Sequence, residues 1–89
     1  MPQAPDEIVV TVRYFAAARA AAGAESETVT VRQGTTVADL VEKLAGQNTR
    51  LATVLSRCSY LRDGVAVRVQ HTELQPGETI DVLPPFAGG

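Results

Sequence analysis

One amphipathic helix is expected between residues 36 and 46, and it is the element that most constrains the fold. Thr36 is suited to the N-cap position, and Asp39 resembles the second member of a capping box. The helix is expected to end at Gly46. Its apolar side chains form a single stripe made of Val37, Leu40, Val41 and Leu44. A helix of about three turns cannot bury such a stripe alone, so it must pack across a sheet.

The segments on both sides of this helix alternate apolar and polar side chains with the period of a β-strand. The strands expected from this period are residues 8–14, 27–32, 59–62, 65–69 and 79–83. Asp63-Gly64 is a strong hairpin-turn dipeptide, and it joins the third and fourth of these strands. The inward side chains of the first and last strands are Ile8, Val10, Val12, Tyr14, Ile80 and Val82.

Two further segments have helical patterns but are short. Residues 16–22 are rich in alanine, and Gly23 is expected to close them as one helical turn. Residues 49–57 carry a second group of apolar side chains and predict a shorter helix after the main one. Because the connection that follows Gly23 is short, the first two strands are expected to form an antiparallel hairpin.

These elements predict an α+β domain with a mixed sheet and one main helix packed across it. The first and last strands are expected to be central and parallel, because the main helix then packs against both. Residues 1–7 are expected to form a short N-terminal arm, residues 8–83 the domain, and residues 84–89 an extended tail. A chain of 89 residues is long enough for one modest core.

Composition excludes several classes of protein. The net charge is −2 and the pI is near 5.2, with no basic stripe, which argues against a nucleic-acid-binding protein. No apolar run approaches the roughly 18 residues that a membrane-spanning helix requires. Residues 1–7 carry neither the basic nor the apolar region of a secretory signal, so a cytoplasmic location is expected.

The chain has one cysteine and one histidine, too few for an intrachain disulfide or a zinc site built from these residues. Arg57 adjoins Cys58, but no general base lies near it in sequence, so a buried or half-buried structural thiol is favoured over a nucleophile. His71 lies in a polar stretch and is expected in a solvated loop or at a strand end.

The C-terminal segment combines a stiff base with a slender end. Pro84 and Pro85 have a restricted φ and favour an extended exit from the last strand. Gly88 and Gly89 have no β-carbons, so the terminal carboxylate could pass through a narrow passage. The last six residues would span at most roughly 20 Å. This pattern favours a chain end that another protein acts on.

Several apolar residues lie close to this exit. Alternation turns Phe15 and Leu83 away from the helix face, Val65 is expected to join them, and Phe86 adds an aromatic side chain on the tail. A group of such side chains on one surface is typical of a docking patch. Irregular strand geometry that buries these side chains is the alternative.

The sequence also resembles a known family. The motifs that carry the resemblance are residues 12–19 (VRYFAAAR), 34–37 (GTTV), 63–64 (DG), 76–78 (PGE) and 83–89 (LPPFAGG). They are similar to those of the ubiquitin-like sulfur carriers, above all the MoaD-type small subunits of molybdopterin synthase. The resemblance covers residues 8–89, and the Pro-Pro-x-x-Gly-Gly ending is its most specific motif. It implies a β-grasp, or ubiquitin-like, fold.

The resemblance also implies a function and its partners. An ATP-dependent partner adenylates the carboxylate of Gly89, and a sulfur transfer converts it to a thiocarboxylate. The large synthase subunit takes in the tail, and sulfur passes to a cyclic pyranopterin precursor. Two sulfurs need two loaded carriers, which implies a heterotetramer. ATP and Mg belong to the activating partner, and this chain is expected to bind no cofactor or metal and to have no active site of its own.

Site residues follow from the same resemblance. Gly88 and Gly89 carry the chemistry, while Phe86, Pro84 and Pro85 set the approach. Phe15, Val65 and Leu83 form the apolar contact with the partner. Arg19 either pairs with a partner carboxylate or forms an ion pair within the domain.

Other readings of the chain stay open. It could supply sulfur for thiamine, cysteine or thiolated tRNA, because the partner selects the acceptor. It could instead be a ubiquitin-like protein modifier joined through Gly89, or a plain interaction domain whose Gly-Gly is incidental.

Overall fold

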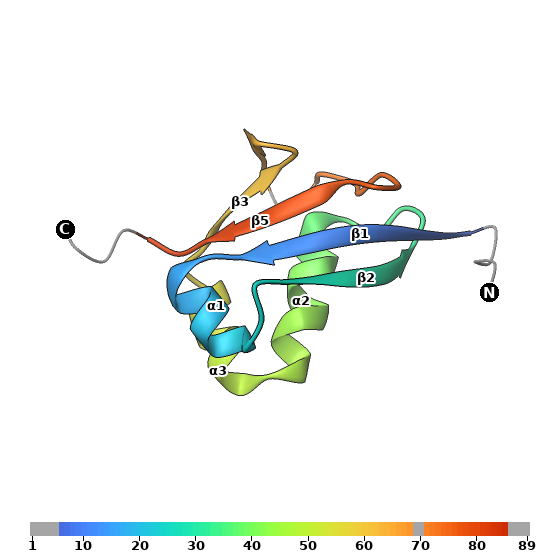
Figure 1. The fold of residues 1–89 in the computed structure, drawn as a ribbon. Helices are drawn as coiled ribbons and strands as arrows, with labels where there is room; N and C mark the ends of the chain where they lie inside the picture. The colour runs from blue at the N-terminus through green and yellow to red at the C-terminus, as the bar shows by residue number, and fades with distance from the viewer. Residues whose placement is uncertain (1–5, 69–70, 86–89) are drawn as a thin grey trace.

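The computed structural model describes residues 6–68 and 71–85, and in it helices cover one face of a five-stranded sheet (Figure 1). The strands are β1 (Glu7–Tyr14), β2 (Ser26–Arg32), β3 (Ser59–Arg62), β4 (Val65–Ala66) and β5 (Thr79–Leu83). The helices are α1 (Ala16–Ala22), α2 (Val37–Gln47) and α3 (Thr49–Leu55). None of these helices is long and apolar enough to cross a membrane. Val69, Phe86, Gly88 and Gly89 lie outside the described residues.

The strand order is β2-β1-β5-β3-β4, so the first and last strands are central, as predicted. β1 pairs with β5 in parallel, with Val12 opposite Ile80 and Tyr14 opposite Val82. β1 also pairs with β2 in the predicted antiparallel manner. The mixed sheet and the helix across it confirm the α+β prediction.

The core lies between the sheet and the helices, and the alternation of the sequence sets its composition. Every second residue of β1 is buried, from Ile8 to Tyr14, and Val12 and Val82 are fully inaccessible. The predicted stripe of α2 meets this surface: Val37, Leu40 and Leu44 are each at most 1% exposed, and Val41 is half-buried. Burial of the stripe against two parallel strands therefore holds the helix on the sheet.

The start of α2 is as predicted, but its end is not. The Thr36 side chain accepts a hydrogen bond from the Asp39 N–H, and the Thr36 N–H donates to the Asp39 carboxylate, which completes the capping box. Gly46 lies inside the helix, so the prediction that it ends α2 is wrong. Asn48 follows the last turn of α2 and caps α3 by accepting the N–H of Leu51. Its amide also donates to the Ala21 carbonyl, which joins α1 to the same corner.

Several other boundaries differ from the prediction. Residues 16–22 form a complete short helix rather than a single turn. α3 ends at Leu55 rather than Arg57, and β4 contains two residues rather than five. β1 begins at Glu7, one residue before the predicted strand, because Glu7 already pairs with Arg32 in the sheet.

We expect Leu40→Ala to lower the free energy of unfolding by about 2–5 kcal/mol, because a fully buried side chain leaves a cavity against the sheet. Urea denaturation followed by circular dichroism measures this loss. Glu42→Ala on the exposed side of the same helix is the matched control and should change stability by less than about 0.5 kcal/mol. Equal losses for both variants would contradict the placement of α2.

Candidate functional site

The last described residues leave the domain from the centre of the sheet. β5 ends at Leu83 beside the end of β1, where the Phe15 N–H donates to the Val82 carbonyl at 3.2 Å. Pro84 is half-buried and Pro85 is exposed. Figure 1 shows this exit at one end of the molecule, far from the start of β1. The base of the C-terminal segment is therefore anchored on both sides by neighbouring strands.

The helices leave the opposite side of the sheet uncovered, and we call this side the open face (Figure 1). Because Tyr14 and Val82 are paired and point inward, the next residues, Phe15 and Leu83, are neighbours on the open face. Phe15 is 37% exposed, and Leu83 is half-buried. We call these two residues the apolar patch, and the sequence placed both of them on this face.

Val65 does not belong to the apolar patch. It is 67% exposed, but its partner in the register is Arg62, which in turn lies opposite the buried Ile80. Residues opposite one another share a face of the sheet, so Val65 lies in a row that faces the helix side. The prediction that Val65 joins Phe15 and Leu83 on one face is therefore wrong. The two-residue turn after Arg62 places Val65 directly opposite Arg62. Because side chains alternate between the two faces of a strand, this register decides which face Val65 lies on.

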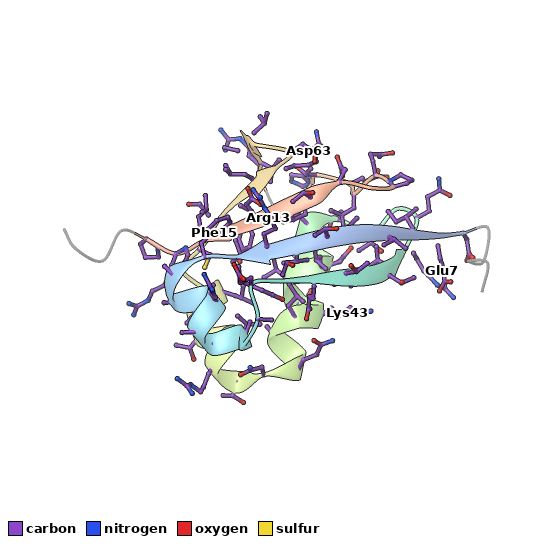
Figure 2. All side chains as sticks on the ribbon, viewed as in Figure 1. Glu7, Arg13, Phe15, Lys43 and Asp63 are labelled. Atoms are coloured by element: carbon purple, nitrogen blue, oxygen red, sulfur yellow. The ribbon has the colours of Figure 1, made fainter. Side chains whose placement is uncertain are left out.

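An ion pair that local sequence patterns do not predict lies beside the apolar patch. Arg13 Nε donates to Asp81 Oδ1 at 2.6 Å, and Nη2 donates to Oδ2 at 2.8 Å. The guanidinium carbon lies 5.5 Å from the centre of the Phe15 ring, one of the side chains labelled in Figure 2. The hydrogen bond to Asp81, and then its charge, raise the pKa of Arg13 above its ordinary value.

Alternation alone could have placed Arg13 and Asp81 on the open face, because each stands between two inward-facing residues of its strand. Their contact needs one more fact, the register of the parallel pair, which puts Arg13 directly opposite Asp81. That register joins strands 68 residues apart in the chain. No local turn specifies it, so local patterns could not reveal the pair.

Arg19 lies near the same end of the sheet, on α1. Its guanidinium is 3.5 Å from a carboxylate oxygen of Glu25, and both side chains are more than half exposed. An exposed pair of this kind contributes about 0–1 kcal/mol to stability. The ion pair within the domain that the sequence offered as one alternative is thus present, and the Arg19 side chain still faces solvent.

A groove adjoins the base of the C-terminal segment on the other side from the apolar patch. The residues that line it come from α1, from α3 and the turn after it, and from the segment itself: Ala17, Thr53, Val54, Arg57, Pro84 and Pro85. A protein that holds Pro84 and Pro85 would therefore meet the apolar patch on one side and this groove on the other.

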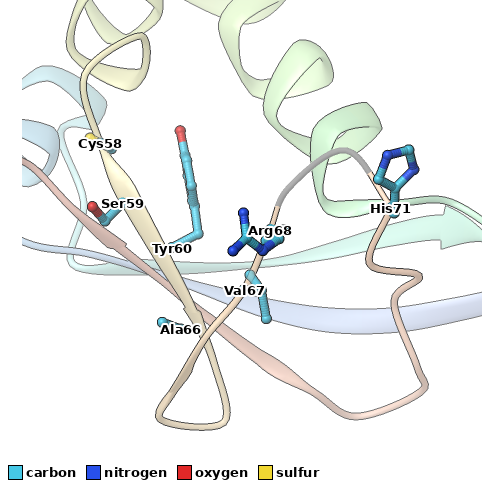
Figure 3. Close-up of a pocket in the computed structure, with 7 residues that line it drawn as sticks. All are labelled: Cys58, Ser59, Tyr60, Ala66, Val67, Arg68 and His71. Atoms are coloured by element: carbon cyan, nitrogen blue, oxygen red, sulfur yellow. The ribbon is translucent and has the colours of Figure 1, made fainter.

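Cys58 and His71 line a different pocket, and Figure 3 shows them at opposite ends of it, with Tyr60 and Arg68 between them. The Cys58 thiol donates to the Val54 carbonyl at 3.3 Å, and burial raises its pKa above the ordinary value. A raised pKa keeps the thiol protonated near neutral pH, where it is a poor nucleophile. Among residues 6–68 and 71–85, no three His, Cys, Asp or Glu side chains gather into a group that could hold a metal ion.

Two comparisons of sequence bear on the family. The ThiS family matches residues 12–89. The molybdopterin synthase sulfur carrier subunit of Chlamydomonas reinhardtii is 30% identical over 81 residues, covering 90% of this chain and 98% of the relative. The human molybdopterin synthase sulfur carrier subunit is 33% identical over 87 residues, covering 90% of this chain and 93% of the relative.

Solved structures of other proteins have the same fold as this chain. The Haloferax volcanii HVO 2177 protein matches with a TM-score of 0.85 at 25% identity, covering 100% of this chain and 93% of that one. Small archaeal modifier protein 1 of Methanosarcina acetivorans matches with a TM-score of 0.78 at 25% identity, covering 93% and 98%.

A chain from the complex of subunits 1 and 2 of molybdopterin-converting factor from Helicobacter pylori has the same fold. Its TM-score is 0.64 at 22% identity, with coverage of 92% of this chain and 100% of that one. These matches confirm the predicted β-grasp fold. With the family match over most of its length, the chain belongs to the ThiS family of ubiquitin-like proteins.

Proposed function

We propose that this chain is the sulfur-carrier subunit of a molybdopterin synthase and that the Gly89 carboxylate carries the sulfur. The observation on which the proposal rests is the position of β5, which runs through the centre of the sheet and leads directly into Pro84, Pro85 and the sequence Phe-Ala-Gly-Gly. The names of the two relatives that match 90% of the chain support the choice of molybdopterin synthase.

The proposed loading reaction has two steps. A terminal carboxylate has a pKa of roughly 3.5, so it is ionised at neutral pH and can act as a nucleophile. One of its oxygens attacks the α-phosphorus of ATP on an activating partner, and pyrophosphate leaves with the electrons of the broken P–O bond. A sulfur nucleophile at the sulfide level then attacks the carbonyl carbon, and AMP leaves. The product is a thiocarboxylate at Gly89.

The proposal assigns catalysis to the partners. ATP and Mg belong to the activating enzyme, and the large synthase subunit binds the cyclic pyranopterin precursor. The thiocarboxylate sulfur attacks a carbon of that precursor, a C–O bond at this carbon breaks and its oxygen leaves with the bonding electrons, and hydrolysis of the resulting thioester leaves the sulfur on the precursor and returns the carboxylate. Because a dithiolene contains two sulfurs, the assembly needs two loaded carriers, which favours a heterotetramer. This chain supplies a reactive group and a rigid base from which to present it.

The modifier reading is the main rival, because small archaeal modifier protein 1 shares the fold at 25% identity. Both readings use an activated Gly89, and they differ in the acceptor. A modifier would form covalent adducts with lysines of other proteins, whereas a carrier would accumulate as a thiocarboxylate. Carriers for thiamine, cysteine or tRNA thiolation differ from the proposal only in the partner that accepts the sulfur.

Intact mass spectrometry tests the chemistry. After incubation with the activating enzyme, ATP and a sulfide donor, we expect the wild-type chain to gain the mass difference between one sulfur and one oxygen, located on Gly89. Gly88→Val should fold normally and remain unloaded, because a β-branched side chain obstructs the passage to the carboxylate. An alanine added after Gly89 should also abolish loading. A wild-type chain that stays unmodified while a known carrier is loaded would refute the proposal.

Binding measurements test the apolar patch. Phe15→Arg should weaken binding to the large subunit by at least about tenfold, or about 1.4 kcal/mol, because it places a charge in an apolar contact. Leu83→Arg should act in the same direction, and the melting temperature of both variants should stay close to that of the wild type. Val65→Arg is the comparison variant, since Val65 is exposed on the other face. A large loss of stability would instead show that Phe15 or Leu83 belongs to the core.

A further inference from the structure

The two side chains of the Arg13–Asp81 ion pair differ in solvent exposure, and the more exposed one, Arg13, is accessible to a docking partner. The Asp81 side chain is 8% exposed, whereas the Arg13 side chain is 52% exposed. Both carboxylate oxygens of Asp81 accept from the guanidinium. The carboxylate is thus buried and paired, while about half of the Arg13 side chain is exposed on the open face.

Arg13 has hydrogen-bond donors to spare. A guanidinium carries five N–H groups, and Asp81 accepts from Nε and Nη2. Within residues 6–68 and 71–85, Asp81 is the one acceptor that Arg13 has, and neither of its hydrogen bonds uses the Nη1 group. The Phe15 ring against one face of the guanidinium and the fork to Asp81 hold the Nη1 donors in a defined direction.

A partner that covers the apolar patch also covers Arg13, because Arg13 and Phe15 share the open face two residues apart. Covering an N–H group without giving it an acceptor costs free energy, since the bond to water is lost and nothing replaces it. Resting on the proposed function, we propose that Arg13, fixed by Asp81, is a specificity-determining residue for the large subunit. The partner must present a neutral hydrogen-bond acceptor, such as a main-chain carbonyl, to the outer edge of this guanidinium.

Charge favours a neutral acceptor over a carboxylate. The fork to Asp81 balances the charge of Arg13, so the pair as a whole is neutral. A partner carboxylate would add an uncompensated negative charge close to the buried Asp81 carboxylate. A carbonyl completes the hydrogen bonding of the guanidinium without this repulsion.

The chain offers a matched pair for comparison. Arg62 Nε lies 3.1 Å from Glu78 Oε2, and the two side chains are 37% and 10% exposed. This pair is similar to the first in charge and burial, although Glu78 Oε1 also accepts the Gln75 N–H. Arg62 lies in the row that faces the helix side. A purely structural role for arginine–carboxylate pairs would make the two pairs equivalent in binding experiments.

The test is titration calorimetry of the full chain with the large synthase subunit at several salt concentrations. Arg13→Met combined with Asp81→Leu removes the donors and both charges together, an exchange that folded proteins tolerate well. We expect this double variant to keep its melting temperature and to bind about tenfold more weakly, with the same salt dependence as the wild type. The control, Arg62→Met with Glu78→Gln, keeps an acceptor for the Gln75 N–H and should bind like the wild type.

Three results would overturn the inference. Wild-type affinity in the Arg13/Asp81 double variant would show that the pair is structural. A shallower salt dependence in that variant would show that the partner supplies a charged acceptor. Binding losses of equal size in both double variants would show a general effect of removing such pairs.

A second variant covers the case in which the double variant fails to fold. Arg13→Lys keeps a positive charge opposite Asp81 but lacks the planar fork, so its affinity should still fall several-fold. Affinity equal to that of the wild type would overturn the inference. If the wild-type chain itself failed to bind the large subunit, the proposed function would fall as well, whereas equal binding by wild type and variants would refute the role of Arg13 alone.

Discussion

The parallel pairing of β1 with β5 is the constraint on which the rest of the structure depends. It brings together two segments from opposite ends of the chain, and each carries an inward apolar row that α2 covers. Parallel strands need a long crossover connection, and here the elements between β1 and β5 form it. Because β5 is central, the last residues of the domain inherit the rigidity of the sheet.

The same pairing produces the candidate site on the other side of the sheet. Inward-facing Tyr14 and Val82 place Phe15 and Leu83 together on the open face, and one register step back brings Arg13 opposite Asp81. The core and the candidate site therefore depend on the same β1–β5 register, but they lie on opposite faces of the sheet. A substitution that enlarges or charges an open-face side chain can alter docking without a cavity in the core, while a register slip would disturb both at once.

Local signals in the sequence were sufficient for most elements and failed where a distant contact decided the outcome. The capping box at Thr36 and the alternation of the strands depend on near neighbours, and both were predicted. Gly46 is the predicted end of the helix, but it lies inside α2, and the chain turns at Asn48, whose side chain caps α3 and bonds to α1. For Val65, the alternation of side chains predicts a strand but not how that strand pairs with its neighbour. Arg13 and Asp81 needed the pairing of the two ends of the chain.

A carrier of this kind gains from keeping its stability apart from its chemistry. The buried residues of the described domain lie between sheet and helices, and their burial supplies the hydrophobic free energy that holds β5 in the sheet. Under the proposed function, a partner that takes in the C-terminal segment leaves this core in place. Recognition is then proposed to come from the fixed surface at the base of the segment, where the apolar patch offers contact area and the guanidinium of Arg13 offers directional hydrogen bonds. An apolar patch alone would accept many partners, and a donor that must be satisfied restricts them.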